Sequence, residues 1–235
     1  MGINAIWGPP KSGKTTLTID IACAFAQNRK SVCIVSPEPY SEMSARLGIQ
    51  IKLENSLTAA YRPGASINQV VHRVNELLYV LAVPWDHDAF GQHAGSSAAK
   101  QLLEQASAVF DFVLVDCPSH ADTALSAWAM NMADNVLLLS GFDPSAGMWY
   151  TAFQRGITPL EARTVPICVA VTKDYDYLSL CELIRQTPVV WVPHFPNAAE
   201  VQAQKKTLYG DTGKAGHRYS DSIDKICVEL EADWE

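Results

Sequence analysis

The chain has 235 residues, of which 48% are apolar and 18% are charged, and its formal net charge is −7. These proportions are typical of a globular protein with a sizeable core, and no apolar run approaches the roughly 20 residues that cross a bilayer. The first residues show no basic stretch followed by a long apolar one, so we expect no secretory signal and a cytoplasmic location. A protein that binds nucleic acid through the phosphates usually has a basic face, so the negative net charge counts against this function.

Short apolar runs alternate with helical patterns along the chain. Strands are expected, in chain order, at Ile3–Trp7, Val32–Ser36, Leu78–Ala82, Phe112–Asp116, Val136–Leu139, Ile167–Val171 and Val189–Val192. Their continuously apolar cores are typical of strands buried on both faces. Apolar spacing predicts helices at Thr15–Gln27, Ala98–Ala108, Ala121–Met132 and Ser145–Arg155. The alternation predicts one α/β domain over residues 1–235, with a mostly parallel twisted sheet, helices on both faces, and ligands at the carboxyl ends of the strands.

The segment GPPKSGKT, residues 8–15, follows the first expected strand and opens the first expected helix. It has the G-x-x-x-x-G-K-T pattern of a phosphate-binding P-loop. Gly8 and Gly13 allow the backbone to turn tightly, Lys14 is expected to reach the β- and γ-phosphates, and the Thr15 hydroxyl to bind Mg²⁺. Proline has no N–H group, and Pro9 and Pro10 fill the early half of the loop. The N–H groups at the helix N-terminus are therefore expected to come from Ser12, Gly13, Lys14, Thr15 and Thr16.

Two acidic residues follow expected strands and are candidate catalytic groups. Asp116 ends the apolar run in FDFVLVDCPS, where a P-loop protein needs a second metal ligand, acting directly or through water. The alternative is an Asp that caps the next helix. Glu38, in VCIVSPEPY, follows the second strand and is a candidate to orient or activate the attacking water. The alternative is an ordinary exposed Glu in a Pro-rich turn.

Nearly the whole chain resembles the MinD/ParA branch of P-loop ATPases. GPPKSGKTTLTIDIACAFAQNRKSVCIVSPEPY is similar to the phosphate loop, first helix and second strand of that family, and FDFVLVDCPSHADTALSAWAMNMADNVLLLSGFDPSA to its switch II and the following strand. VVWVPHFPNAAEVQAQ resembles the proline-containing loop near the adenine. Within the branch, LTAAYRPGASINQVVHRVNELLYVLAVP is most similar to the pilus-assembly ATPases TadZ and CpaE.

The resemblance implies roles for particular residues. Lys14 and Thr15 match the triphosphate lysine and the Mg²⁺ ligand, Asp116 matches the switch II Asp, and Glu38 falls where the family usually has a catalytic Asp. Residues near the adenine are implied at Thr172, Lys173, Pro193, His194 and Phe195. The resemblance also implies ATP and Mg²⁺ as cofactors, a homodimer with ATP, and a protein partner in a cytoplasmic or membrane-associated machine.

Three departures from the family's pattern leave its activity open. The family's additional lysine, which crosses a dimer interface to the other subunit's nucleotide, falls at Pro9, and Lys11 is either its substitute or a solvated surface lysine. Glu38 is one methylene longer than Asp, at a site where about 1 Å matters. Ser119 replaces the second proline of switch II. Slow hydrolysis and no hydrolysis both remain open.

Three functions are consistent with these residues. The first is an ATP-driven dimerisation switch that localises or assembles a partner machine of the pilus or secretion type. The second is a scaffold that holds nucleotide without hydrolysing it. The third is a ParA-like DNA partition ATPase, against which the net charge of −7 counts.

The segment SDSIDKICVELEADWE near the C-terminus has an apolar stripe at helical spacing and an acidic polar face. Anionic lipid would repel this face. We expect the stripe, formed by Ile223, Ile226, Cys227, Leu230 and Trp234, to pack against the body of the protein or a partner.

Overall fold

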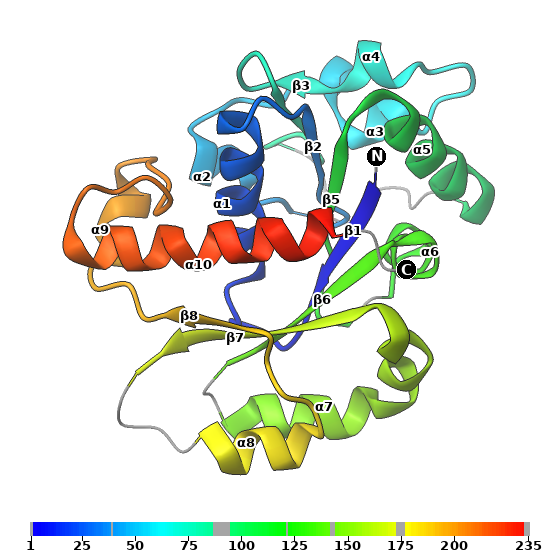
Figure 1. Ribbon diagram of the computed structural model, residues 1–235. Coiled ribbons are helices and arrows are strands. Elements are labelled where there is room, and N and C mark those ends of the chain that lie inside the picture. Colours follow the sequence, from blue (N-terminus) through cyan, green and yellow to red (C-terminus); the bar gives the residue numbers. More distant parts are fainter. Residues whose placement is uncertain are drawn as a thin grey trace.

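The computed structural model describes residues 2–38, 40–86, 95–120, 122–141, 144–172 and 177–232. Their strands form one sheet in the order β3-β4-β2-β5-β1-β6-β7-β8 (Figure 1). The strands are β1 (Gly2–Trp7), β2 (Val32–Val35), β3 (His72–Arg73), β4 (Leu78–Leu81), β5 (Phe112–Asp116), β6 (Asn135–Ser140), β7 (Thr164–Val171) and β8 (Val190–Pro193). Neighbouring strands run parallel except for β3, which pairs antiparallel with β4. This confirms the predicted fold class.

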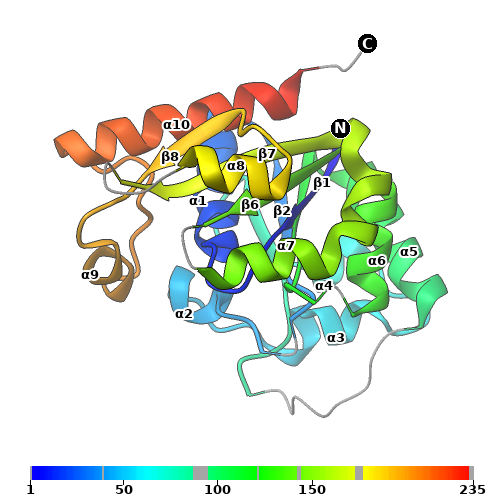
Figure 2. The same ribbon diagram turned by 90° about the horizontal axis from the view of Figure 1, so that it is seen from below.

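Helices cover both faces of the sheet. One face carries α1 (Lys14–Gln27), α2 (Met43–Leu47), α9 (Ala198–Ala203) and α10 (Lys214–Glu231). The other carries α3 (Leu57–Ala60), α4 (Ile67–Val70), α5 (Ser96–Val109), α6 (Ala124–Met132), α7 (Pro144–Ile157) and α8 (Tyr177–Ile184). Two 3₁₀ turns lie at Leu53–Asn55 and Thr158–Arg163. Figures 1 and 2 both show α10 packed next to α1 and β8.

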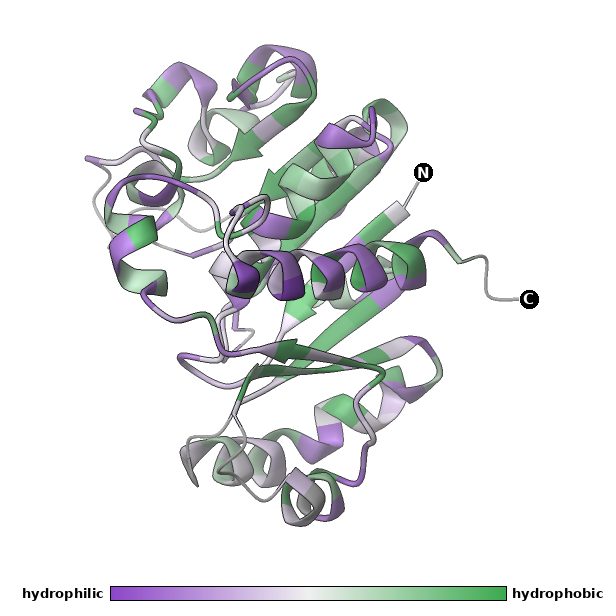
Figure 3. Cartoon of the chain, turned by 60° about the vertical axis from the view of Figure 1, so that its left-hand side comes forward, coloured by the Kyte–Doolittle hydropathy of each residue, from purple (hydrophilic) through white to green (hydrophobic). Residues whose placement is uncertain are grey.

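The central strands contribute side chains to two separate cores. In β5, Val113 and Val115 face the layer of α5 and α6, whereas Leu114 faces the layer of α1 and α10. Both layers exclude water from the strands, which explains why the sequence shows continuous apolar runs instead of alternation. The strands are accordingly coloured as hydrophobic along most of their length in Figure 3, whereas α10 alternates between hydrophilic and hydrophobic residues.

The stripe near the C-terminus packs against the body of the protein, as expected. Ile223, Ile226, Cys227 and Leu230 are buried on the inner side of α10, next to α1 and β8. Trp234 lies outside the described residues. Within the described part of the chain, no helix combines the length and the apolar character that crossing a membrane requires.

Candidate nucleotide-binding site

The P-loop leaves the centre of the sheet, between β1 and α1. Gly8 has φ 155°, and a Cβ atom at this position would lie 2.7 Å from the backbone oxygen of Leu139. Only glycine therefore lets the loop pass this close to β6. Gly13 has φ 83° and precedes the first residue of α1. Lys11 is exposed and has φ 60°, a left-handed conformation that glycine adopts more readily than lysine.

Several polar groups of the loop lie at the N-terminal end of α1. The Ser12 N–H donates to the Pro9 carbonyl at 3.3 Å, and the first bond into α1 runs from the Leu17 N–H to the Gly13 carbonyl at 2.9 Å. The N–H groups of Lys14, Thr15 and Thr16 precede that bond, at the helix end where an anion is favoured. The Ser12 hydroxyl is buried without a hydrogen-bond partner among the described residues.

The Lys14 side chain folds back over the loop. Its ammonium group donates to the carbonyls of Gly8 at 3.3 Å and Pro9 at 3.0 Å, and to the Ser119 hydroxyl at 2.7 Å. Burial lowers the pKa of Lys14, while the carboxylates of Asp116 and Glu38 act in the opposite direction. The cation is thus held among oxygen atoms at the place where the P-loop pattern puts phosphate oxygens.

Thr15 and Asp116 meet although 101 positions separate them. The Thr15 hydroxyl donates to Asp116 Oδ2 at 2.8 Å. Parallel pairing of β1 with β5, which places Ile6 beside Asp116, brings this carboxylate to the loop. Asp116 is 3% exposed, and its Oδ1 atom has no hydrogen-bond partner among the described residues. Burial raises the pKa of Asp116 to about 6, although the Thr15 hydrogen bond and the Lys14 charge lower it.

Glu38 lies close enough to interact electrostatically with this cluster. Its carboxylate is half-buried, and burial raises its pKa against the opposing charge of Lys14. The Glu38 charge in turn contributes to the raised pKa of Asp116. The structure therefore brings the P-loop lysine, Lys14, together with the two candidate catalytic carboxylates, Glu38 and Asp116.

The residues expected near the adenine follow β7 and β8. Thr172 and His194 are exposed, whereas Phe195 is buried and packs edge-on against Tyr219, with ring centroids 5.6 Å apart. Lys173 lies outside the described residues. β7 contains an irregularity between Cys168 and Val171, next to Ala170 with φ 59°. Such bulges often re-aim the chain beside a binding site.

Sequence reasoning missed the contacts that tie this second segment to α1. The Gln202 side chain donates to the Thr16 hydroxyl at 3.1 Å. Asp20 accepts from the N–H groups of Leu208 and Tyr209 at 3.1 and 3.2 Å and from the Tyr219 hydroxyl at 2.7 Å. In the sequence, these contacts are signalled by Asp20 itself, which lies between Ile19 and Ile21 in an apolar helical stretch. This signal does not identify the partners of Asp20, which lie almost 200 positions away.

The oxygen atoms at the P-loop fit the requirements of Mg²⁺. This ion prefers oxygen ligands, takes one or two from the protein, and completes its shell with water and substrate phosphates. The Thr15 hydroxyl and the unpartnered Oδ1 of Asp116 match that donor set. Across the described residues, no group of three or more His, Cys, Asp and Glu side chains could hold a metal ion by itself.

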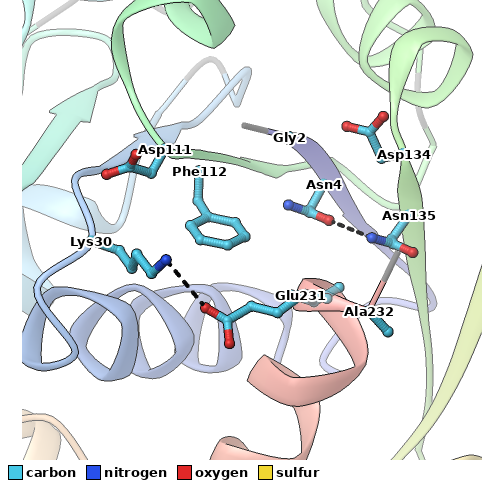
Figure 4. Close-up of a pocket in the computed structure, with 10 residues that line it drawn as sticks. Gly2, Asn4, Lys30, Asp111, Phe112, Asp134, Asn135, Glu231 and Ala232 are labelled. Carbon is cyan, nitrogen blue, oxygen red and sulfur yellow. Dashed lines mark hydrogen bonds and ion pairs between the residues drawn. The ribbon is translucent and has the colours of Figure 1, made fainter. Parts of the chain in front are cut away.

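A separate hollow of about 670 Å³ lies at the opposite edge of the sheet, near the amino ends of β1, β5 and β6 (Figure 4). Asn4 and Asn135 are hydrogen-bonded to each other there, and Lys30 pairs with Glu231 at 3.9 Å. Because the P-loop lies at the carboxyl edge, this hollow is not part of the candidate nucleotide site.

The sheet order, the glycine-lined loop and the lysine–threonine–aspartate cluster define a P-loop nucleoside triphosphatase fold. The AAA_31 family, described as an AAA domain, matches residues 11–147, more than half of the chain. The chromosome partitioning protein ParA of Myxococcus xanthus (strain DK1622) is 27% identical over 134 residues, which cover 54% of this chain and 47% of that protein. The chain thus spans about half the length of this curated relative.

Solved structures agree on the fold. A ParA family ATPase from Chlorobium tepidum TLS has a TM-score of 0.79 at 13% identity, over 97% of this chain and 98% of that one. The septum site-determining protein MinD from Pyrococcus horikoshii OT3, complexed with Mg-ADP, has a TM-score of 0.76 at 17% identity, over 98% and 96% of the two chains. At these identities the likeness shows the fold alone. The chain belongs to the AAA_31 family, among the MinD/ParA-like P-loop ATPases.

Proposed function

We propose that this chain binds ATP with Mg²⁺ at its P-loop and works, as one nucleotide-binding domain over residues 1–235, as a slow ATPase whose bound nucleotide drives homodimer formation. The hydrogen-bonded pair of Thr15 and Asp116 carries the proposal, because it places two hard oxygen ligands beside the loop lysine. A glycine-containing turn that matched the P-loop pattern by chance would not be expected to contact a buried carboxylate at a strand end 101 positions away.

Each part of the loop then has a task. Gly8 lets the loop turn close against β6. The N–H groups from Gly13 to Thr16, with Lys14, hold the phosphates, and the Ser12 N–H joins them by leaving the Pro9 carbonyl. Thr15 and Asp116 hold the metal ion, which when bound neutralises charge on the phosphate oxygens. Lys11, exposed within the loop, is a candidate to contact phosphate across a dimer interface.

Glu38 is the proposed group that orients the attacking water. Its half-buried position and its electrostatic interaction with the Lys14 charge support this role. Glu is one methylene longer than the Asp that the family usually has here, which supports slow hydrolysis, since about 1 Å of misplacement can cost a large part of the rate.

We propose that the adenine base of the nucleotide lies beside the segments that follow β7 and β8. Thr172, Lys173, Pro193, His194 and Phe195 are the proposed contacts. The hydrogen bond between Gln202 and Thr16 supports this placement, because it holds the segment after β8 against the first turn of α1.

Large exposed apolar side chains at the carboxyl edge support a docking function. Tyr40 is 70% exposed after β2, Trp85 is 63% exposed after β4, and Met148 is 76% exposed near the start of α7. All three follow the carboxyl ends of strands, as the P-loop does. Exposed apolar side chains on the nucleotide side favour a surface that a second copy or a protein partner covers. We propose a partner of the pilus or secretion type, and a cytoplasmic location with membrane association only through that partner.

Light scattering tests the switch. Mg-ATP should double the mass of the wild-type protein in solution, and Lys14→Ala should remain monomeric. Lys30→Ala, at an exposed position beside the hollow at the amino edge of the sheet, is the matched control and should dimerise as the wild type does. The same mass with and without Mg-ATP in the wild type would refute the dimerisation switch.

Pro9, in the position of the family's additional lysine, favours a second candidate, a scaffold that holds nucleotide without hydrolysing it. Single-turnover phosphate release separates the two. Release that disappears in Glu38→Gln excludes the scaffold, whereas its complete absence in the wild-type protein establishes it. Salt-sensitive retention of duplex DNA in a gel-shift titration with ATP would instead favour a ParA-like partition function.

A further inference from the structure

Two buried tryptophan side chains donate to the same backbone oxygen. The indole N–H of Trp7 reaches the Ser119 carbonyl at 3.3 Å, and that of Trp149 reaches it at 3.0 Å. Trp7 is 2% exposed and Trp149 is 5% exposed. A buried indole N–H needs an acceptor, and a carbonyl oxygen has two lone pairs. The Ser119 carbonyl satisfies both indoles, and we name Trp7 and Trp149 the indole clamp.

The rings of the indole clamp are held firmly in place. The Trp7 and Trp149 ring centroids lie 4.8 Å apart in an edge-on arrangement, and Phe153 stacks on Trp149 at 4.9 Å. Next to Trp149 on α7, the Tyr150 hydroxyl donates to the Leu139 carbonyl at 2.8 Å. The indole N–H groups of Trp7 on β1 and Trp149 on α7 therefore hold the Ser119 carbonyl of switch II in place among packed aromatic rings.

The side chain of that same residue holds the P-loop lysine. The Ser119 hydroxyl accepts from the Lys14 ammonium group at 2.7 Å, the shortest of the three bonds that Lys14 donates. An ammonium group has three donors, and the two P-loop carbonyls and Ser119 use all of them. Phosphate oxygens can bind Lys14 only by replacing some of these acceptors. A proline in position 119, which the family usually has, carries no hydroxyl for this contact.

We propose that the indole clamp fixes switch II so that Ser119 binds the Lys14 ammonium group before nucleotide does, and that this contact lowers the affinity for nucleotide. Trp7 and Trp149 are thus positioning residues that act through Ser119. The affinity part of the inference rests on the proposed function, whereas the positioning of switch II does not.

Hydrogen exchange in the nucleotide-free protein tests the positioning. Trp149→Phe keeps an aromatic ring and removes the indole donor, so amide exchange over residues 117–120 should become faster. Trp128→Phe is the matched control, because the Trp128 indole donates to the Ser96 hydroxyl at an exposed site between α6 and the start of α5, and it should leave exchange over 117–120 unchanged. Unchanged exchange over 117–120 in Trp149→Phe overturns the indole clamp.

Calorimetry with Mg-ATP tests whether the Ser119 hydroxyl competes with nucleotide for the Lys14 ammonium group. Ser119→Ala removes the competing hydroxyl and should tighten binding by at least about fivefold, since hydrogen bonds to charged groups are among the stronger ones. Trp149→Phe should tighten binding less, by about twofold, and should add nothing in the Ser119→Ala background, because it acts through that hydroxyl. Equal or weaker binding by Ser119→Ala, or an equal effect of Trp149→Phe in both backgrounds, overturns the inference.

One measurement needs no variant of the clamp. In wild-type protein labelled with ¹⁵N-tryptophan, the indole protons of Trp7 and Trp149 should exchange with water far more slowly than that of Trp128, and fast exchange of either one would overturn the clamp. If the wild-type protein binds no nucleotide, the proposed function fails, and the two exchange measurements still decide whether the clamp exists.

Discussion

The buried carboxylate of Asp116 should make the nucleotide-free protein less stable at neutral pH. Its pKa is about 6 in the folded protein, against an ordinary value of 3.8, chiefly because of burial. Between these two values the folded state binds more protons than the unfolded state, so the free energy of unfolding falls as the pH rises through this window and stays low above it. Asp116→Asn removes this charge and should stabilise the empty protein at neutral pH.

The size of the effect follows from the same shift. Each pKa unit corresponds to about 1.4 kcal/mol, so the charged carboxylate costs about 3 kcal/mol above pH 6. The amide that replaces it still lacks one partner, at a cost of about 1 kcal/mol. The free energy of unfolding of Asp116→Asn should therefore exceed that of the wild type by about 2 kcal/mol near pH 7.5. Near pH 4, where little of the carboxylate cost remains, the variant should be no more stable than the wild type. Urea denaturation in EDTA measures both values.

Asp111, at the other end of the same strand, is the matched control. Its carboxylate accepts hydrogen bonds from the backbone and hydroxyl of Ser31, at 2.8 and 2.7 Å, and these bonds hold its pKa below the ordinary value. Its contribution to stability is present at neutral pH and is lost as the pH falls through the depressed pKa, so Asp111→Asn should be destabilising at neutral pH. If Asp116→Asn is destabilising as well, burial does not dominate the energetics of Asp116.

Two further predictions concern stability. Gly8→Ala should lower the free energy of unfolding by about 2 kcal/mol or more, because its Cβ would meet the Leu139 carbonyl at 2.7 Å. Gly156 is exposed in α7, and a Cβ there would have its nearest atom at an ordinary 3.7 Å. Gly156→Ala should therefore raise the free energy of unfolding by about 0.5–1 kcal/mol. Tyr219→Phe should cost about 1–3 kcal/mol by removing a donor from buried Asp20, whereas Tyr209→Phe, whose hydroxyl bonds exposed Asp224, should change stability by less than about 0.5 kcal/mol. Urea denaturation near pH 7.5 checks all four variants, and equal effects within either pair would contradict the reasoning.

The regular elements of the sheet were predictable because long apolar runs encode them. The predicted strand Phe112–Asp116 is confirmed with its bounds unchanged. Each of the other predicted strands either lies within the observed strand or extends past one of its ends by one residue. β3 (His72–Arg73) was not predicted, because two residues are too few to show a strand pattern. Among the predicted strands β7 differs most: Pro166 interrupts the apolar run, so the predicted strand starts at Ile167, whereas the observed strand begins at Thr164. Pro166 lacks an N–H group, but it still pairs in register with Leu138 and accepts from the Val189 N–H.

The short helices were not predictable. α2, α3 and α4 have four or five residues each, too few for a helical period to show, and packing rather than propensity stabilises helices of this length. The predicted helix Ala121–Met132 begins at Ala124 instead, and Ala121 lies outside the described residues.

Within the site, the local pattern predicted the parts that adjoin the P-loop or end a strand. Parallel strands bring Asp116 to Thr15 by register alone. The acceptor of Lys14 at Ser119, the indole donors on the same residue and the partners of Asp20 depend on tertiary contacts between distant segments. No sequence period encodes such contacts, so only the structure could reveal them.

Isothermal titration calorimetry of the purified protein with Mg-ATP tests nucleotide binding at the P-loop most directly. The wild-type protein should give saturable heat with one nucleotide per chain, and Lys14→Ala should give none, whereas Lys30→Ala, at the opposite edge of the sheet, should bind as the wild type does. No heat from ATP or GTP at millimolar concentration with the wild-type protein would contradict nucleotide binding by this loop.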